Sequence, residues 1–356
     1  MKTIATSFIA MLFLAAGAAH AATPDPFNGV LRIGGSDQMN SLLARWEQGF
    51  AKLHPKVRFE HWRKGSGTGM YGLEMHTTDL ALMGRPINPY ERYGIYERAW
   101  VYPMEIEVAT GAVSRPHKSP AYAIFVNKSN PLARLTMQQL DGIFGAERGG
   151  GWKALTWDES AAHSKEQNIR SWGQLGLSGE WANQPIRTYG PPNLGAGAIT
   201  AFQNMVMGGG AIFNEDLREY ADRKQMVADL EKDPQGIAYG PLSYATPGVK
   251  PLAIAVSPRG PFVSLNAKTV TDRSYPLARP VYIYTTIDND KTEIADPRVK
   301  PLVREFLRYV LSAAGQQAVR VDGIYAPLPA AVIGAQNEKL DFQGVPPERK
   351  LLKDED

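Results

Sequence analysis

The stretch that decides the fold is residues 62–87, Trp-Arg-Lys-Gly-Ser-Gly-Thr-Gly-Met-Tyr-Gly-Leu-Glu-Met-His-Thr-Thr-Asp-Leu-Ala-Leu-Met-Gly-Arg-Pro-Ile. It opens with a turn rich in glycine and hydroxyl groups at 65–69, continues at helical spacing, and reaches an apolar strand at 80–83 followed by Gly84-Arg85. Turns of this composition let the backbone approach a ligand closely, and a following helix points its free N–H groups at that ligand. Such a place favours a small anion.

The polar residues of this stretch are candidate ligand-binding residues. Ser66, Gly67 and Thr68 lie in the turn, and Asp79 and Arg85 follow about one helix later. Each also has a structural interpretation. Ser66 and Thr68 are common turn formers, Asp79 before a strand commonly accepts hydrogen bonds from the backbone, and Arg85 is equally suited to a surface ion pair.

Apolar strands and amphipathic helices alternate along most of the chain. A helix with Leu42, Leu43, Trp46, Phe50 and Leu53 on one face follows Gly34-Gly35-Ser36-Asp37, and Thr136 with Gln139 forms a capping box at another helix start. We predict strands at residues 30–33, 57–59, 80–83, 121–127, 186–189, 236–239, 252–256 and 280–285. This alternation predicts an α/β fold with mostly parallel sheets and with ligand sites at the carboxyl ends of strands.

The N-terminus has the pattern of a secretory signal peptide at residues 1–21. Lys2 precedes an apolar run at 4–19, which ends in the small-x-small sequence Ala19-His20-Ala21. A retained N-terminal anchor is the alternative, but the run is short for a membrane span. The chain has no cysteine, so it has neither a lipidation site nor a disulfide framework. We therefore expect a soluble periplasmic protein.

Composition and residue spacing argue against several functions. The 356 residues carry a formal net charge of only +3 with interspersed signs, which argues against a nucleic-acid partner. The histidines lack metal-binding spacing, and no G-x-S-x-G nucleophile motif occurs, so we expect no metal, no cofactor and no catalysis. A secreted phosphatase is the enzyme alternative, and it would need a nucleophile with a base, or a metal set.

A series of short runs, in order along the chain, resembles one family. The runs are Gly34-Gly35-Ser36, Trp46, Gly65-Ser66-Gly67, Asp79, Arg85, Asn130-Pro131, Leu135-Thr136, Gln139-Leu140, Ile143-Phe144, Ile186-Arg187, Gly236-Ile237-Ala238-Tyr239, Tyr275-Pro276-Leu277, Arg279-Pro280, Ser312 and Gly315-Gln316-Gln317. Each run is unspecific, but their joint order covers nearly the whole mature chain. On this basis the chain resembles the type II periplasmic solute-binding proteins, specifically the phosphate-binding components of ABC importers.

The resemblance implies two α/β lobes around a cleft and a chain that crosses between them twice. Lobe I would hold residues 25–115 and 258–335, and lobe II would hold 116–257 with an insertion at 146–182. Residues 336–356 would form a charged surface tail. The protein would be a monomer that captures inorganic phosphate or a similar tetrahedral oxyanion, closes by hinge motion, and delivers its ligand to a membrane permease.

The resemblance also implies a ligand set. Ser36 or Asp37 would supply the first turn, although Asp37 also suits a helix cap, and Ser66 would supply the second. Asp79 would accept a hydrogen bond from the protonated oxygen of monohydrogen phosphate, and Arg187 would neutralise charge.

The family's Ser-Gly-Thr turn reads Ala196, Gly197 and Ala198 here, so two hydroxyl groups are missing. Their loss is expected to weaken phosphate binding by on the order of a hundredfold unless backbone N–H groups compensate. This departure leaves open a second role for the same fold, a periplasmic sensor or adhesion protein without a transporter.

Overall fold

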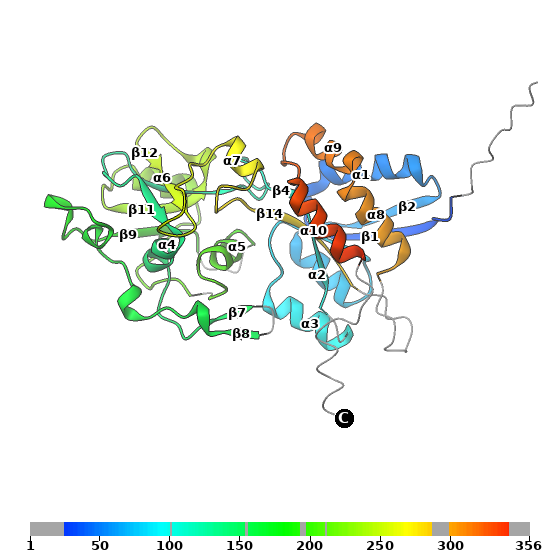
Figure 1. Ribbon diagram of the computed structural model, residues 1–356, viewed down its shortest axis with the longest axis horizontal. Coiled ribbons are helices and arrows are strands. Elements are labelled where there is room, and N and C mark those ends of the chain that lie inside the picture. Colours follow the sequence, from blue (N-terminus) through cyan, green and yellow to red (C-terminus); the bar gives the residue numbers. More distant parts are fainter. Residues whose placement is uncertain are drawn as a thin grey trace, which may run out of the picture.

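The structure is a computed structural model that describes residues 25–99, 102–153, 156–192, 197–210, 212–286 and 299–341. The predicted signal peptide at 1–21 lies outside these residues, as does Ala196 of the candidate ligand set. Two five-stranded sheets lie side by side along the long axis of the molecule, each with its own covering helices (Figure 1).

The first sheet has the strand order β2-β1-β3-β14-β4. Its strands are β1 (Gly29–Gly35), β2 (Val57–Trp62), β3 (Leu80–Met83), β4 (Met104–Thr110) and β14 (Pro280–Thr285). β1 pairs parallel with β2 and β3, whereas β14 pairs antiparallel with β3 and β4. Four strands therefore run one way, and only the strand that returns from the other half of the chain runs against them.

The second sheet repeats this plan in the order β10-β9-β11-β5-β12. Its strands are β5 (Tyr122–Asn127), β9 (Arg187–Gly190), β10 (Arg218–Glu219), β11 (Gly236–Pro241) and β12 (Val249–Pro251). β9 pairs parallel with β10 and β11, and β5, the first strand after the chain enters this half, pairs antiparallel with β11 and β12. Smaller two-stranded sheets join β6 (Arg134–Thr136) to β13 (Ala253–Ala255) and β7 (Gly151–Lys153) to β8 (Thr156–Asp158).

Helices cover both sheets and bury apolar faces against them. On the first half these are α1 (Asn40–Leu53), α2 (Ser66–Glu74), α3 (Pro89–Ala99), α8 (Pro301–Leu311), α9 (Ala313–Asp322) and α10 (Ala330–Asp341). On the second they are α4 (Met137–Phe144), α5 (Gly197–Val206), α6 (Arg223–Leu230) and α7 (Ala267–Thr271). Among the described residues, none of the helices combines the length and the apolar character that a membrane crossing requires.

Two details of local sequence form as predicted. α1 buries Leu42, Leu43, Trp46 and Phe50, although Leu53 at its end is 59% exposed. At the start of α4 the Thr136 hydroxyl accepts from the Gln139 N–H at 3.1 Å, and the Gln139 side chain accepts from the Thr136 N–H at 2.9 Å. This capping box satisfies backbone donors that a helix start otherwise leaves free.

Two parts of the predicted division differ from the structure. Val270 and Tyr275 pack in the core of the second sheet, so the chain returns to the first half near Arg279 rather than at 258. Their apolar side chains are buried by contacts with that core, which a reading of local sequence does not reveal. The predicted tail from 336 is also wrong at its start, because Leu340 on α10 is buried in the core of the first sheet.

The two crossings between the halves lie beside each other. The Gly111 N–H after β4 donates to the Arg279 carbonyl before β14 at 2.7 Å, and the Tyr122 N–H donates to the Leu277 carbonyl at 3.1 Å. In the first crossing, His117 and Ser119 hold positive φ angles of 58° and 49°. These paired connections are the place where a relative motion of the two sheets would be absorbed.

Glycine is required at the end of β1, and the stability cost of replacing it can be measured. Gly35 and Gly65 both have positive φ, +109° and +100°, but a Cβ on Gly35 would lie 2.3 Å from the Leu82 carbonyl oxygen, whereas nothing lies within 4 Å of one on Gly65. We expect Gly65→Ala to lower the free energy of unfolding by about 1–3 kcal/mol through backbone strain alone. Gly35→Ala should cost clearly more because the steric clash adds to the strain. Urea unfolding without ligand measures both, and equal losses would contradict this account.

Candidate functional site

A cavity of about 390 Å³ lies where the two sheets face each other. Its border is formed by Ser36, Gln38, Gly65, Ser66, Gly67, Gly84, Arg85, Pro116, His117, Ser119, Pro120, Tyr122, Pro191, Gly197, Ala198, Arg223, Tyr239, Gly240, Pro241, Tyr244 and Arg279. Ser36, Gly84 and Pro191 come directly after β1, β3 and β9, so the cavity sits at the carboxyl ends of parallel strands, where the alternation of elements predicts a ligand site.

Two helices from opposite halves begin at this cavity. α2 starts at Ser66 next to the first sheet, and α5 starts at Gly197 next to the second. The first N–H groups of a helix have no partner within it, and its N-terminus carries a partial positive charge. Both features favour an anion between the two helix starts.

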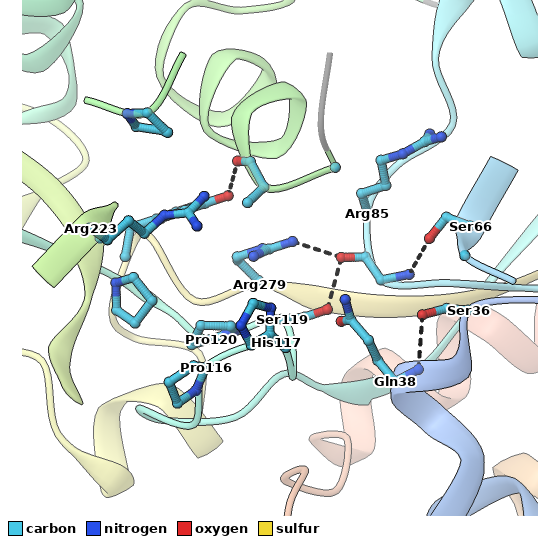
Figure 2. Close-up of a pocket in the computed structure, with 18 of the residues that line it drawn as sticks. Ser36, Gln38, Ser66, Arg85, Pro116, His117, Ser119, Pro120, Arg223 and Arg279 are labelled. Atoms are coloured by element: carbon cyan, nitrogen blue, oxygen red, sulfur yellow. Dashed lines mark hydrogen bonds between the residues drawn. The ribbon is translucent and has the colours of Figure 1, made fainter. Parts of the chain in front are cut away.

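The backbone of Gly84 connects several residues at the border of the cavity (Figure 2). Its N–H donates to the Ser66 hydroxyl at 3.3 Å, and its carbonyl accepts from the Ser119 hydroxyl at 2.8 Å and from Arg279 Nη2 at 2.7 Å. On the neighbouring turn, the Ser36 hydroxyl accepts from the Gln38 N–H at 3.3 Å. Ser66 and Ser36 thus keep their own hydrogen atoms available for a further acceptor.

Three arginines border the cavity, and their surroundings differ. Arg85 forms two hydrogen bonds with the Glu91 carboxylate, at 2.7 and 2.6 Å, and its stem lies against Gly197 at the start of α5. Arg223 is the first residue of α6. Arg279 is only 5% exposed, and its guanidinium lies 5.0 Å from the centre of the Tyr122 ring. Between the labelled groups of Figure 2, Arg279 occupies the middle of the site.

Two tyrosines of the second sheet complete the wall. The Tyr122 hydroxyl donates to the Ala198 carbonyl in the first turn of α5, and Tyr239 on β11 stacks on Phe202 of α5 with ring centres 3.7 Å apart. Burial raises the pKa of both hydroxyls above the ordinary tyrosine value. Both therefore stay protonated at neutral pH and can donate a hydrogen bond.

The structure brings six of the predicted ligand residues to this cavity. They are Ser36, Ser66, Gly67, Gly197, Ala198 and Arg85. Arg85 borders the cavity, and its ion pair with Glu91 is buried rather than at the surface, since the two side chains are 7% and 10% exposed. Whether these residues contact a ligand stays a prediction.

Arg187 is not at the cavity, and its predicted role is corrected. It is the first residue of β9, whereas the cavity lies beyond the last, and its Nη1 pairs with Asp233 Oδ1 at 2.7 Å. The side chain is 39% exposed. Because β9 begins at Arg187, the arginine is at the amino end of the strand, at the edge of the sheet away from the site.

Asp79 also lies at the end of its strand that is away from the cavity. It directly precedes β3, while the cavity lies after the other end of that strand at Gly84. Its carboxylate accepts from the Arg32 N–H at 2.9 Å and lies 3.3 Å from Lys300 Nζ. Asp79 therefore has the backbone-bonding role that its sequence position alone suggests.

Two other predicted residues serve the local backbone. The Thr68 hydroxyl donates to the Gly65 carbonyl at 2.8 Å and so closes the turn. Asp37 is the first residue of a 3-10 turn, η1 (Asp37–Met39), but Ser36 is its cap. Neither Thr68 nor Asp37 borders the cavity.

Sequence reasoning missed Arg223, Arg279 and Tyr239. Arg279 and Tyr239 belong to runs that carry the family resemblance, but those runs gave them no role. The sequence did contain a signal for Arg279, because this arginine directly precedes an apolar strand. Burying an arginine there is energetically unfavourable unless a partner is near. In the part of the chain that the structure describes, no group of three or more histidine, aspartate or glutamate side chains is placed to hold a metal ion.

The fold and this site are those of a binding protein with two α/β lobes, and comparison with known proteins agrees. Residues 16–314 match the family model described as the PBP superfamily domain. The chain therefore belongs to the PBP superfamily of periplasmic binding proteins, with the type II fold.

Individual relatives within this superfamily have more specific names. The chain is 32% identical to the phosphate-binding protein PstS of Pseudomonas aeruginosa, over 86% of this chain and 85% of that protein. It is 27% identical to PstS of Staphylococcus saprophyticus, over 88% and 85% of the two chains. Among solved structures, PstS from Borrelia burgdorferi aligns with a TM-score of 0.53 at 16% identity, covering 85% and 99%. An ABC-type phosphate transport receptor from Vibrio cholerae aligns at 0.52 and 17%, covering 84% and 100%.

The placement of Arg187 gives a direct test. We expect Arg187→Ala to leave the affinity for phosphate unchanged within about twofold, because the guanidinium lies outside the cavity and is paired with Asp233. Stability should fall by no more than about 1 kcal/mol, the range for partly exposed ion pairs. Isothermal titration calorimetry and urea unfolding check the two statements. A loss of affinity of tenfold or more would return Arg187 to the site.

Proposed function

We propose that the protein binds a small tetrahedral oxyanion, phosphate, outside the cytoplasmic membrane and delivers it to an ABC importer without catalysing a reaction. The observation that carries this proposal is the meeting of the α2 and α5 N-termini at one cavity that arginines border. The names of the PstS relatives support phosphate as the ligand.

The site offers the kinds of donor that an oxyanion needs. Hydroxyls of Ser36 and Ser66, the N-termini of α2 and α5, and arginines border the cavity from several sides. A hydrogen bond to a charged group contributes roughly 1.5–3 kcal/mol, so a few of them give useful affinity. The neighbouring crossings between the sheets provide the hinge by which such a cavity closes over its ligand.

The location and partners follow from the same proposal. A signal peptide at 1–21 would export the chain to the periplasm, and a membrane permease would receive the closed form. That the protein is a monomer and binds no nucleic acid stays a prediction. Uptake of radiolabelled phosphate by a strain lacking this protein separates import from a sensory or adhesion role, since only an importer component is needed for uptake.

Binding is tested on the purified mature protein. We expect phosphate to raise the midpoint of thermal unfolding, because a ligand that binds only the folded state adds about 2.7 kcal/mol of stability at a hundred times its Kd. Sodium chloride at matched ionic strength is the control and should give no comparable shift. Absence of any shift with millimolar phosphate would contradict the proposal, as would steady release of phosphate from p-nitrophenyl phosphate by the pure protein.

A further inference from the structure

Two buried polar groups at the cavity have no hydrogen-bond partner in the free protein. They are Nε of Arg279 and the hydroxyl of Tyr239. Arg279 is 5% exposed and Tyr239 is 2% exposed. Of the eight buried side-chain atoms without a partner among the described residues, these two belong to residues that border the cavity. Native structures satisfy the large majority of their buried polar groups, so a pair of such atoms at one cavity points to a ligand.

The surroundings of Arg279 leave its charge without a carboxylate. Its Nη2 donates to the Gly84 carbonyl, and its guanidinium faces the Tyr122 ring, but no ion pair joins it to any described residue. Arg85 and Arg187, by contrast, are paired with Glu91 and Asp233. A buried cation without a counter-charge is strongly stabilised by an anion that enters beside it.

Tyr239 supplies a neutral donor from the other half of the molecule. Its ring is fixed by stacking on Phe202 of α5, with an angle of 8° between the ring planes, so the hydroxyl moves with the α5 N-terminus. Burial keeps the hydroxyl protonated. Its oxygen is covered and Tyr239 borders the cavity, so an anion there contacts the hydroxyl once this wall shifts locally.

We infer that Arg279 and Tyr239 are ligand-binding residues that hold the oxyanion from opposite halves of the molecule. Arg279 takes the charge-neutralising role that the family resemblance implies for Arg187. Tyr239 supplies a hydroxyl donor where the turn at 196–198 has lost two. This inference rests on the proposed function, because it names the residues by which the same site binds phosphate.

The test uses Tyr239→Phe and Arg279→Met in the mature protein, with inorganic phosphate as the probe. Each variant removes the unpartnered group and keeps most of the side-chain volume. Titration calorimetry should show phosphate binding weakened about tenfold by Tyr239→Phe and a hundredfold or more by Arg279→Met. Urea unfolding without phosphate should show Tyr239→Phe at least as stable as the unchanged protein, because the removed hydroxyl has no partner there. Arg279→Met should lose some stability, because it also removes the Nη2 hydrogen bond to the Gly84 carbonyl.

A matched control is Tyr275→Phe. Tyr275 is 1% exposed in the same core, does not border the cavity, and its hydroxyl donates to the Tyr122 carbonyl at 2.7 Å. This variant should lose stability and keep its affinity, the reverse of Tyr239→Phe. Should Arg279→Met not fold, Arg279→Lys keeps the charge but loses Nε–H, and about a tenfold loss of affinity is expected.

The outcomes separate the two proposals. Phosphate binding by the unchanged protein, with full affinity in Tyr239→Phe and in the folded Arg279 variant, overturns the inference and leaves the proposed function intact. Loss of stability in Tyr239→Phe as large as in Tyr275→Phe, without loss of affinity, assigns Tyr239 a structural role and also overturns it. No phosphate binding by the unchanged protein overturns the proposed function, and the inference with it.

Discussion

The arrangement of the site depends on the backbone hydrogen bonds of one residue, Gly84. Its N–H is bonded to Ser66 at the start of α2, and its carbonyl is shared by Ser119 of the first crossing and Arg279 at the end of the second. A Cβ at Gly84 would lie 2.7 Å from the Ser119 hydroxyl, so only glycine allows this approach. These bonds fix four parts of the molecule relative to β3: the start of α2, both connections between the halves, and the buried Arg279 cation. A shift in any one of them therefore displaces the others.

This junction links binding to the movement of the two sheets. Ser119 and Arg279 belong to the connections themselves, and those connections are bonded to each other from the Gly111 N–H to the Arg279 carbonyl. A ligand at Arg279 therefore acts at the hinge rather than at the tip of one lobe. The second half contributes the α5 N-terminus, which the Tyr122 hydroxyl ties to β5 through the Ala198 carbonyl. An anion held by both halves stabilises the closed arrangement by its additional contacts there.

The sequence predicted the fold better than the site, and strand ends explain the difference. Apolar periodicity and capping chemistry are local, so the buried face of α1 and the Thr136 capping box follow from neighbouring residues. Ser36 and Ser66 were found because their glycine-rich turns leave a strand or begin a helix. Arg187 and Asp79 were misplaced because local sequence does not say which end of a short strand faces the other lobe. That choice depends on pairing with strands far away in the chain, as with Arg187 beside Gly236.

For anion binding, whether an arginine is already paired with a carboxylate matters more than how many arginines lie near the cavity. The chain as a whole carries only +3, and two of its arginines near or along these strands are already neutralised, Arg85 by Glu91 and Arg187 by Asp233. A neutralised arginine gains little from a second anion unless its first partner leaves, and leaving costs the charge-assisted hydrogen bonds already made. A small anion is therefore bound most favourably where a buried cation has only neutral neighbours. In the described part of the chain Arg279 fits that condition, which favours the proposed site beside the second crossing.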